Sequence, residues 1–221
     1  MPTNVVNISE VILNGIVFDP KNSKALKHMD FEKLIESIPR LFELLEQRKI
    51  DYALIGGIAM LVYVDGRNTQ DVDIIIATDG LDRLPEIKID ERNPEFARGW
   101  LGELRVDLLF TNNKLFKKVL SDHVAERDFV ERKVTCATAE GLLLLKLFAL
   151  PSLYRQVRFD RVRIYENDVA ELMEHYSPKT PPIFDELAKH VLPSDLEEIR
   201  NIVREIEERI ARSRKRFGNG Q

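Results

Sequence analysis

The sequence has little cysteine and no long apolar segment. Its single cysteine, Cys136, excludes an intrachain disulfide and gives no sign of secretion. The longest apolar run, residues 142–150, is interrupted by Lys146 and is shorter than the roughly 20 residues that span a bilayer. The first ten residues lack a basic segment followed by an apolar core, so no signal peptide is expected. We therefore expect a cytoplasmic protein that does not bind a membrane.

Histidine is also scarce, and the four histidines are scattered without the spacing of a metal site. The formal net charge of -4 does not by itself predict nucleic-acid binding, although local basic clusters remain candidates for it. The chain does contain 44% apolar residues, enough for a proper core, and 32% charged residues. This composition predicts a soluble globular protein of one large domain or two small ones.

The hydrophobic pattern changes along the chain from mixed helices and strands to helices alone. An amphipathic helical stripe that starts at Phe31 contains Pro39, which is expected to kink or split the helix. Apolar or alternating segments predict strands at 51–55, 71–77 and 103–110, and an extended stretch at 129–136. Helices are predicted at 139–150, 165–175, 183–191 and 194–214, with prolines between them. We predict an α+β fold with an irregular segment at 1–30, an α/β domain at 31–136 and a helical domain at 137–221.

Two aspartates one residue apart, Asp71 and Asp73, open an apolar β-branched run. Side chains at positions i and i+2 of a strand point to the same face, so these carboxylates should repel each other unless a cation lies beside them. Mg²⁺ is the expected cation because it prefers oxygen ligands and leaves coordination positions for water and phosphate. A turn or a solvated strand end would also explain the pair taken alone.

A glycine pair, Gly56-Gly57, lies between a predicted strand and a predicted helix. Glycine lets a phosphate approach the backbone closely, and a helix N-terminus presents unpaired N–H groups, so the pair fits a phosphate cradle. A tight turn is the alternative. Arg67 and Thr69 come just before the two acids, where they are able to bind phosphate or to orient the carboxylates.

A third acid, Asp107, interrupts the apolar strand predicted at 103–110. An unpaired carboxylate inside a sheet is costly, so this residue needs a partner. If its strand neighbours the strand of Asp71 and Asp73, Asp107 joins these two acids. The alternative is an ion pair with Arg105 or Arg98.

These elements, in this order and spacing, resemble the motifs of the DNA polymerase β-like nucleotidyltransferase superfamily. The resemblance covers about residues 50–112 and implies a minimal nucleotidyltransferase fold, a short mixed sheet with flanking helices. It implies that Asp71 and Asp73 are shared ligands of two Mg²⁺ ions. It further implies that Asp107 helps to hold the catalytic ion and can take the proton of the attacking hydroxyl, with an NTP such as ATP as substrate.

The second half of the sequence points to one group of proteins within this superfamily. Lys146 on an apolar helix and Asp168 at the start of a later helix look like positions of the AbiEii/MenT nucleotidyltransferase toxins. There the lysine contacts the triphosphate and the aspartate supports the site. Residues 151–160 do not align, and Asn167 replaces the usual basic residue. Alternatively, Lys146 is a core-helix lysine whose charged end reaches water, and Asp168 is only a charge at a helix start.

A basic stretch between these helices, interleaved with aromatic residues, suits phosphate contacts and base stacking on RNA. Its arginines are Arg155, Arg158, Arg161 and Arg163. The sequence thus predicts transfer of NMP from an NTP to an acceptor hydroxyl. The resemblance implies RNA as acceptor, such as the 3′ end of tRNA, and a toxin–antitoxin setting with an antitoxin partner. A protein or small-molecule acceptor, or a non-catalytic nucleotide-binding module, remains as an alternative.

Overall fold

The computed structural model describes residues 5–130 and 132–217. The chain divides into two compact units, Met1–Thr138 and Ala139–Gln221. The first unit contains the sheet and its flanking helices, and the second contains helices only. This arrangement confirms the predicted fold class.

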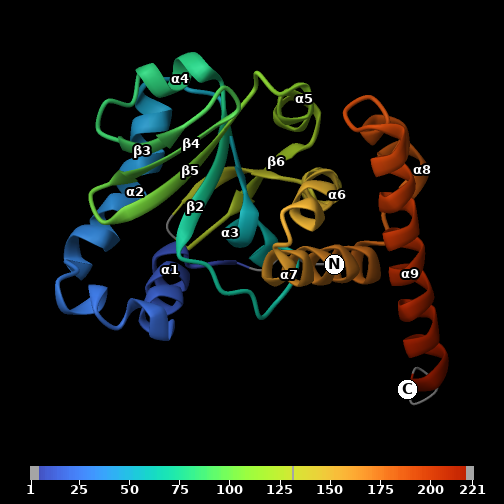
Figure 1. Cartoon of the computed structure of the whole chain (residues 1–221). Coiled ribbons are helices and arrows are strands. Elements are labelled where there is room, and N and C mark those ends of the chain that lie inside the picture. Colours follow the sequence, from blue (N-terminus) through green and yellow to red (C-terminus); the bar gives the residue numbers. More distant parts are fainter. Residues whose placement is uncertain (1–4, 131, 218–221) are drawn as a thin grey trace. The chain divides into compact units, whose positions relative to one another are not determined.

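The first unit begins with helical segments and then alternates strands with short helices (Figure 1). Its helices are α1 (Ile8–Val17), α2 (Phe31–Gln47), α3 (Gly56–Leu61), α4 (Thr78–Asp82) and α5 (Lys114–Asp122), with the 3-10 turns η1 (Pro20–Asn22) and η2 (Ala25–Lys27). Its strands are β1 (Tyr52–Ile55), β2 (Asp71–Ile76), β3 (Lys88–Arg92), β4 (Phe96–Leu101), β5 (Leu104–Phe110), β6 (Val124–Asp128) and β7 (Lys133–Ala137).

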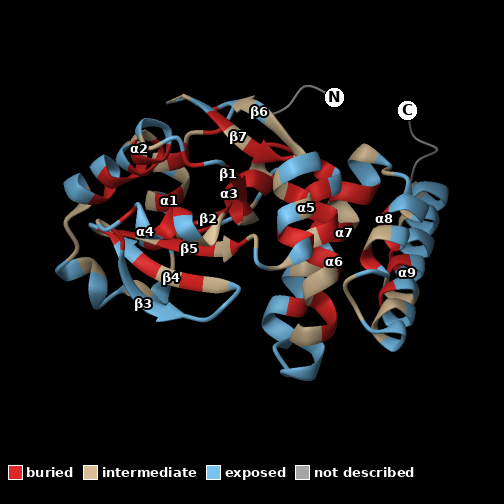
Figure 2. Cartoon of the chain, turned by 90° about the horizontal axis from the view of Figure 1, so that it is seen from above, coloured by how far each residue is buried: buried red, intermediate tan, exposed pale blue. Residues whose placement is uncertain are grey.

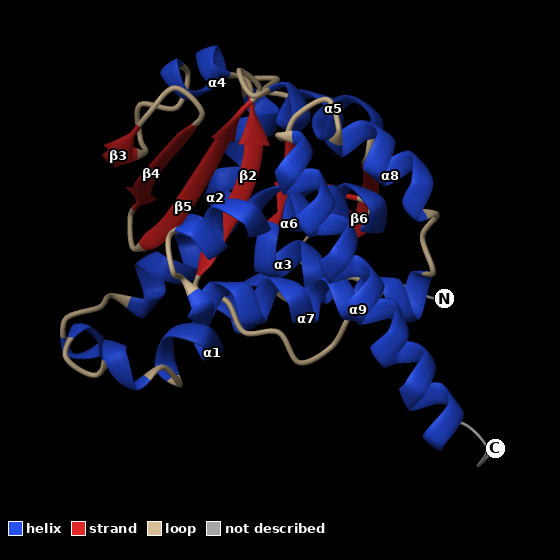
Figure 3. Cartoon of the chain, turned by 45° about the vertical axis from the view of Figure 1, so that its right-hand side comes forward, coloured by secondary structure: helices blue, strands red, loops and turns tan. Residues whose placement is uncertain are grey.

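The seven strands form one mixed sheet in the order β3-β4-β5-β2-β1-β7-β6. The central pair, β2 and β5, is parallel, whereas β4 runs antiparallel to β5 (Figure 3). In this pair Asp71 lies beside Arg105 and Asp73 lies beside Asp107. The sheet therefore brings together two segments that are more than thirty residues apart in sequence.

The two faces of the central strands differ in chemistry because side chains alternate along a strand. One face carries Val72, Ile74, Val106 and Leu108, all fully buried. Helix α2 packs on this face, where the ring of Phe42 lies 5.9 Å from that of Tyr52. The opposite face carries the three predicted acids, and we call it the acid face. Strand β3 at the sheet edge is exposed along its whole length (Figure 2).

Three predictions for the first unit are corrected. Within 1–30, predicted as irregular, helix α1 forms with an Asn7 cap and buries Ile8, Ile12 and Ile16; residues 1–4 lie outside the described residues. Helix α2 continues through Pro39 instead of splitting, because its apolar stripe packs on the sheet. Strand β6 was not predicted, since this edge strand has no regular alternation of buried and exposed residues.

The second unit contains α6 (Ala139–Arg155), α7 (Phe159–Tyr176), α8 (Thr180–Leu187) and α9 (Pro193–Phe217). Helix α6 packs against the other three, and α7 packs against α9. The prediction that the first of these helices ends at residue 150 is wrong: α6 passes through Pro151, which is buried with Leu147 and Leu150. Helix α7 begins at Phe159, earlier than residue 165. In the described part of the chain, no helix has both the length and the apolar character needed to cross a membrane.

Cys136 lies on β7 with no exposed surface, and burial raises the pKa of its thiol to about 12. Only the thiolate reacts quickly with thiol reagents. We expect the native protein to be unreactive toward an aromatic disulfide reagent at pH 8, and one thiol to react as urea unfolds the first unit. The absorbance of the aromatic thiol that the reagent releases measures the rate of this reaction. Equal reaction rates without and with urea would contradict the buried position of Cys136.

Candidate active site

The three predicted acids lie on the same face of two neighbouring strands. Asp71 and Asp73 are two residues apart on β2, and Asp107 on β5 is in register with Asp73. Residues in register on adjacent strands point to the same face, so the three carboxylates share the acid face. The side chain of Asp107 is the most enclosed, since this residue is only 7% exposed.

The glycine pair packs directly on this face at the start of α3. Gly56 has a φ of +68°, a conformation that favours glycine. A Cβ atom on Gly56 would lie 1.9 Å from Oδ2 of Asp73, and one on Gly57 would lie 2.7 Å from Cβ of Thr69. The absence of both side chains is therefore what lets Asp73 and Thr69 take their positions.

Replacing Gly56 by alanine tests this contact. We expect the free energy of unfolding to fall by about 3 kcal/mol, since the left-handed backbone is strained and the carboxylate of Asp73 must move. The matched control is Gly66→Ala, because Gly66 also has a positive φ of +75° but no atom within 4 Å of the added Cβ. The control should lose only about 1–2 kcal/mol. Equal losses in urea titrations of both variants would contradict the close packing of Gly56 on Asp73.

Asp71 is oriented by two neighbours. The hydroxyl of Thr69 donates a hydrogen bond of 2.9 Å to Oδ1 of Asp71, and Arg105 forms an ion pair with Oδ2. Thr69 itself is buried against Gly57. Arg67 is half-buried in the loop that leads into β2. Thr69 thus contacts Asp71 directly. Of the two roles predicted for Thr69, binding phosphate or orienting the carboxylates, this contact fits the second.

Asp107 is held by Arg98 of β4. Nε of Arg98 donates to Oδ1 at 2.8 Å and Nη2 donates to Oδ2 at 2.6 Å, so the pair is bidentate. The hydrogen bonds to Asp107 raise the pKa of Arg98, which stays fully charged. Both interpretations of Asp107 therefore apply: this residue lies beside Asp73 and it forms an ion pair, with Arg98 and not with Arg105.

The donor set suits a hard divalent cation, since three carboxylates on one face are the oxygen ligands that Mg²⁺ prefers. Across residues 5–130 and 132–217, however, no three Asp, Glu, His or Cys side chains lie close enough together to hold a metal. The residues fit the ion by chemistry and by strand register, while arginines engage two of the three carboxylates in this conformation.

The second unit contains a buried ion pair formed by the two other predicted residues. Nζ of Lys146 on α6 lies 2.8 Å from Oδ2 of Asp168 on α7, and the two residues are 4% and 2% exposed. Nζ of Lys146 also lies 4.0 Å from the centre of the Tyr165 ring. Lys146 therefore does not extend its charge to water, and Asp168 is more than a charge at a helix start. No sequence pattern predicted the contact between Lys146 and the Tyr165 ring.

The basic stretch lies around the turn between α6 and α7 and is exposed. Arg155 pairs with Asp195 of α9 at 2.7 Å, and Arg158 lies 3.4 Å from Asp160. Arg161 and Arg163, on the first turns of α7, are exposed to solvent. The structure thus places two of the four arginines in ion pairs within the second unit.

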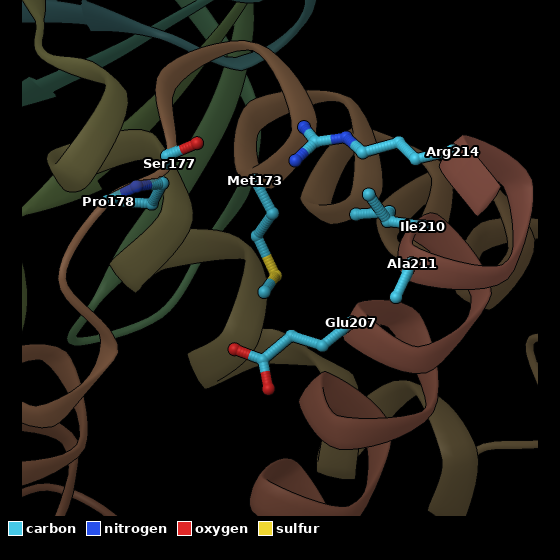
Figure 4. A pocket seen from close by; sticks show the side chains of 7 residues that line it. All are labelled: Met173, Ser177, Pro178, Glu207, Ile210, Ala211 and Arg214. Atoms are coloured by element: carbon cyan, nitrogen blue, oxygen red, sulfur yellow. The ribbon is translucent and has the colours of Figure 1, made fainter. Parts of the chain in front are cut away.

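A shallow pocket of about 330 Å³ lies between the C-terminal end of α7 and α9 (Figure 4). It is lined by Met173, Ser177, Pro178, Glu207, Ile210, Ala211 and Arg214. Arg214 also donates to the carbonyl oxygen of Glu174 at 3.0 Å, which ties the two helices together. None of the predicted site residues lines this pocket.

No protein-family model matches the sequence, and no curated protein matches it. Among solved structures, an antigenic nucleotidyltransferase-like protein from Paracoccidioides brasiliensis superposes with a TM-score of 0.54 at 18% identity, covering 78% of this chain and 87% of that protein. Two structures of the antibiotic-resistance factor ANT(2″)-Ia have TM-scores of 0.48 at 11% identity. The solution structure covers 82% of this chain and 97% of that protein, and the complex with adenylyl-2″-tobramycin covers 78% and 95%.

The likeness to the Paracoccidioides protein shows a shared fold. The chain therefore has a nucleotidyltransferase-like fold, with a mixed sheet, flanking helices and C-terminal helices.

Proposed function

We propose that this protein is a Mg²⁺-dependent nucleotidyltransferase that moves NMP from an NTP to an acceptor hydroxyl. The observation that carries the proposal is the register of β2 and β5, which sets Asp71, Asp73 and Asp107 on one face of a nucleotidyltransferase-like fold. Carboxylates on one face of a sheet are hard oxygen ligands of the kind that Mg²⁺ prefers, and such a cation in turn binds phosphate.

In the proposed reaction the acceptor oxygen forms a bond to the α-phosphorus of the NTP. The bond between the α-phosphorus and the bridging oxygen breaks, and its electron pair leaves with pyrophosphate. The carboxylate of Asp107 is proposed to take the proton of the acceptor hydroxyl. Two Mg²⁺ ions held by Asp71, Asp73 and Asp107 would neutralise the charge of the triphosphate and of the leaving oxygen.

The remaining predicted residues are proposed to position the nucleotide. The backbone of Gly56 and Gly57, which packs directly against Asp73 and Thr69, is proposed to approach a phosphate closely. Thr69 holds Asp71 through its hydroxyl, and Arg67 adds a positive charge in the same loop.

Lys146 is proposed to contact the triphosphate through Nζ, and Asp168 is proposed to support the site. The buried ion pair between them would have to open for Nζ to reach a phosphate.

The acceptor is proposed to be RNA, such as the 3′ end of tRNA, which would make the protein a toxin with an antitoxin partner. This step rests on the resemblance of Lys146 and Asp168 to positions of AbiEii/MenT toxins. Arg155, Arg158, Arg161 and Arg163 are exposed on the second unit and supply charge suited to RNA phosphates.

The proposal is tested by incubating the full chain with Mg²⁺, each α-³²P-labelled NTP and total cellular RNA. We expect labelled RNA, and we expect the label to vanish with Asp73→Ala and to persist with Asp128→Ala. Asp128 is the control because it is an exposed carboxylate on β6 of the same sheet. Label on protein or on a small molecule would show that the acceptor is not RNA. No label with any acceptor, and no binding of Mg²⁺-NTP in calorimetry, would overturn nucleotidyl transfer.

A further inference from the structure

A row of charged residues crosses the acid face and ends at the sheet edge. Across the strands β3, β4, β5 and β2, the residues Glu91, Arg98, Asp107 and Asp73 are in register. A register shift between Ile89 and Glu91 in β3 places Glu91 opposite Arg98. A bulge of this kind inserts an extra residue and redirects the side chains after it. Arg98 therefore lies between two acids, one inside the predicted metal site and one outside it.

The two ion-pair contacts of Arg98 differ in strength. The contact with Asp107 is bidentate, at 2.8 and 2.6 Å, and the side chain of Asp107 is only 9% exposed. The contact with Glu91 is a single 3.6 Å approach to a side chain that is 61% exposed. Bidentate, charge-assisted bonds in an enclosed position are the stronger kind, so Arg98 favours Asp107 in this conformation.

This preference conflicts with metal binding. Both oxygens of Asp107 accept hydrogen bonds from Arg98, and a cation that uses these oxygens must displace the guanidinium group. The side chain of Arg98 is 34% exposed, so it has room to move toward Glu91.

We infer that Arg98 is a competing counter-ion that holds Asp107 in the metal-free protein and moves to Glu91 when a divalent cation takes Asp107. Arg98 is thus a positioning residue that sets the metal affinity of the site, and Glu91 is its second partner. The inference rests on the proposed function, since it assumes that the acid face binds a metal.

The test is a titration of the full chain with Mn²⁺, followed by electron paramagnetic resonance of the free ion, without any assay of activity. Arg98→Lys keeps the positive charge but removes the bidentate geometry. We expect this variant to bind the first Mn²⁺ about 10-fold more tightly, because displacement then breaks one charge-assisted bond fewer. Glu91→Gln removes the second partner, and we expect it to bind Mn²⁺ about 3-fold more weakly.

A matched control separates displacement from the general effect of charge. Arg92 lies on the opposite face, with its guanidinium group 5.9 Å from the centre of the Phe110 ring. We expect Arg92→Gln to leave the Mn²⁺ affinity unchanged. Circular dichroism in EDTA checks that each variant is folded, and if Arg98→Lys does not fold, Glu91→Gln decides.

The outcomes separate this inference from the proposed function. If the wild type binds Mn²⁺ and Arg98→Lys binds it with equal or lower affinity, the role of Arg98 is overturned and the metal site stands. The same holds if Glu91→Gln binds as the wild type does. If the folded wild type binds no Mn²⁺ with or without NTP, both the metal-dependent function and this inference are overturned.

Discussion

Asp73→Asn is expected to reduce nucleotidyl transfer by at least about 10³-fold while the protein keeps its fold. The carboxylate of Asp73 lies between those of Asp71 and Asp107 in the register of the acid face. An amide has nearly the same shape but no charge, so it forfeits several kcal/mol of charge stabilisation in the transition state, which corresponds to a factor of this size. The measurement is the initial rate of label transfer from α-³²P-NTP at saturating nucleotide.

The stability of this variant supplies an independent check. Removing one of three neighbouring negative charges relieves repulsion, so we expect the melting temperature in EDTA to stay the same or to rise. Asp128→Asn on the edge strand β6 is the control for both measurements and should change neither. If Asp73→Asn transfers label at the wild-type rate, the acid face takes no part in catalysis.

Lys146→Met is expected to lower the free energy of unfolding by about 3–5 kcal/mol, because it leaves the charge of Asp168 buried without its ion-pair partner. Lys146 and Asp168 are 4% and 2% exposed, and Nζ lies 2.8 Å from Oδ2. Urea unfolding followed by circular dichroism measures the loss. The control is Arg155→Met on the same helix, which breaks an ion pair whose arginine side chain is 61% exposed. The control should cost at most about 1 kcal/mol.

The double variant Lys146→Met, Asp168→Leu separates structure from function. It removes both charges, and we expect it to recover most of the lost stability, since an apolar pair of similar volume is often as stable as a buried ion pair. If Lys146 contacts the triphosphate as proposed, this folded protein should still fail to bind nucleotide in calorimetry. Wild-type nucleotide affinity in the double variant would limit Lys146 to a structural role.

The sequence predicted the acid face because successive side chains of a strand point to opposite faces, so acids two residues apart share one face. In β2 the acids at 71 and 73 interleave with Val72 and Ile74, and in β5 Asp107 lies between Val106 and Leu108. Alternation fixes which residues share a face within one strand. It does not say which strands are neighbours, so the pairing of β2 with β5 had to come from the structure or from the family resemblance.

Local sequence patterns could not predict the ion-pair partner of Asp107 or the lengths of the helices. Arg98 pairs with Asp107 because β4 and β5 form a hairpin, and Glu91 faces Arg98 only through the register shift in β3. Pro39 and Pro151 are both tolerated inside helices whose neighbouring side chains are buried. In each case tertiary packing outweighs the local preference that the sequence expresses.

The central claim, that Asp71, Asp73 and Asp107 act together on a metal-bound nucleotide, is tested most directly by crystallography. Crystals of the full chain would be grown with Mn²⁺ and an NTP analogue that cannot be cleaved between the α- and β-phosphates. We predict anomalous density for Mn²⁺ in contact with carboxylate oxygens of all three residues, beside the α-phosphate. Nucleotide and Mn²⁺ bound elsewhere, with Asp107 still paired to Arg98, would contradict the account.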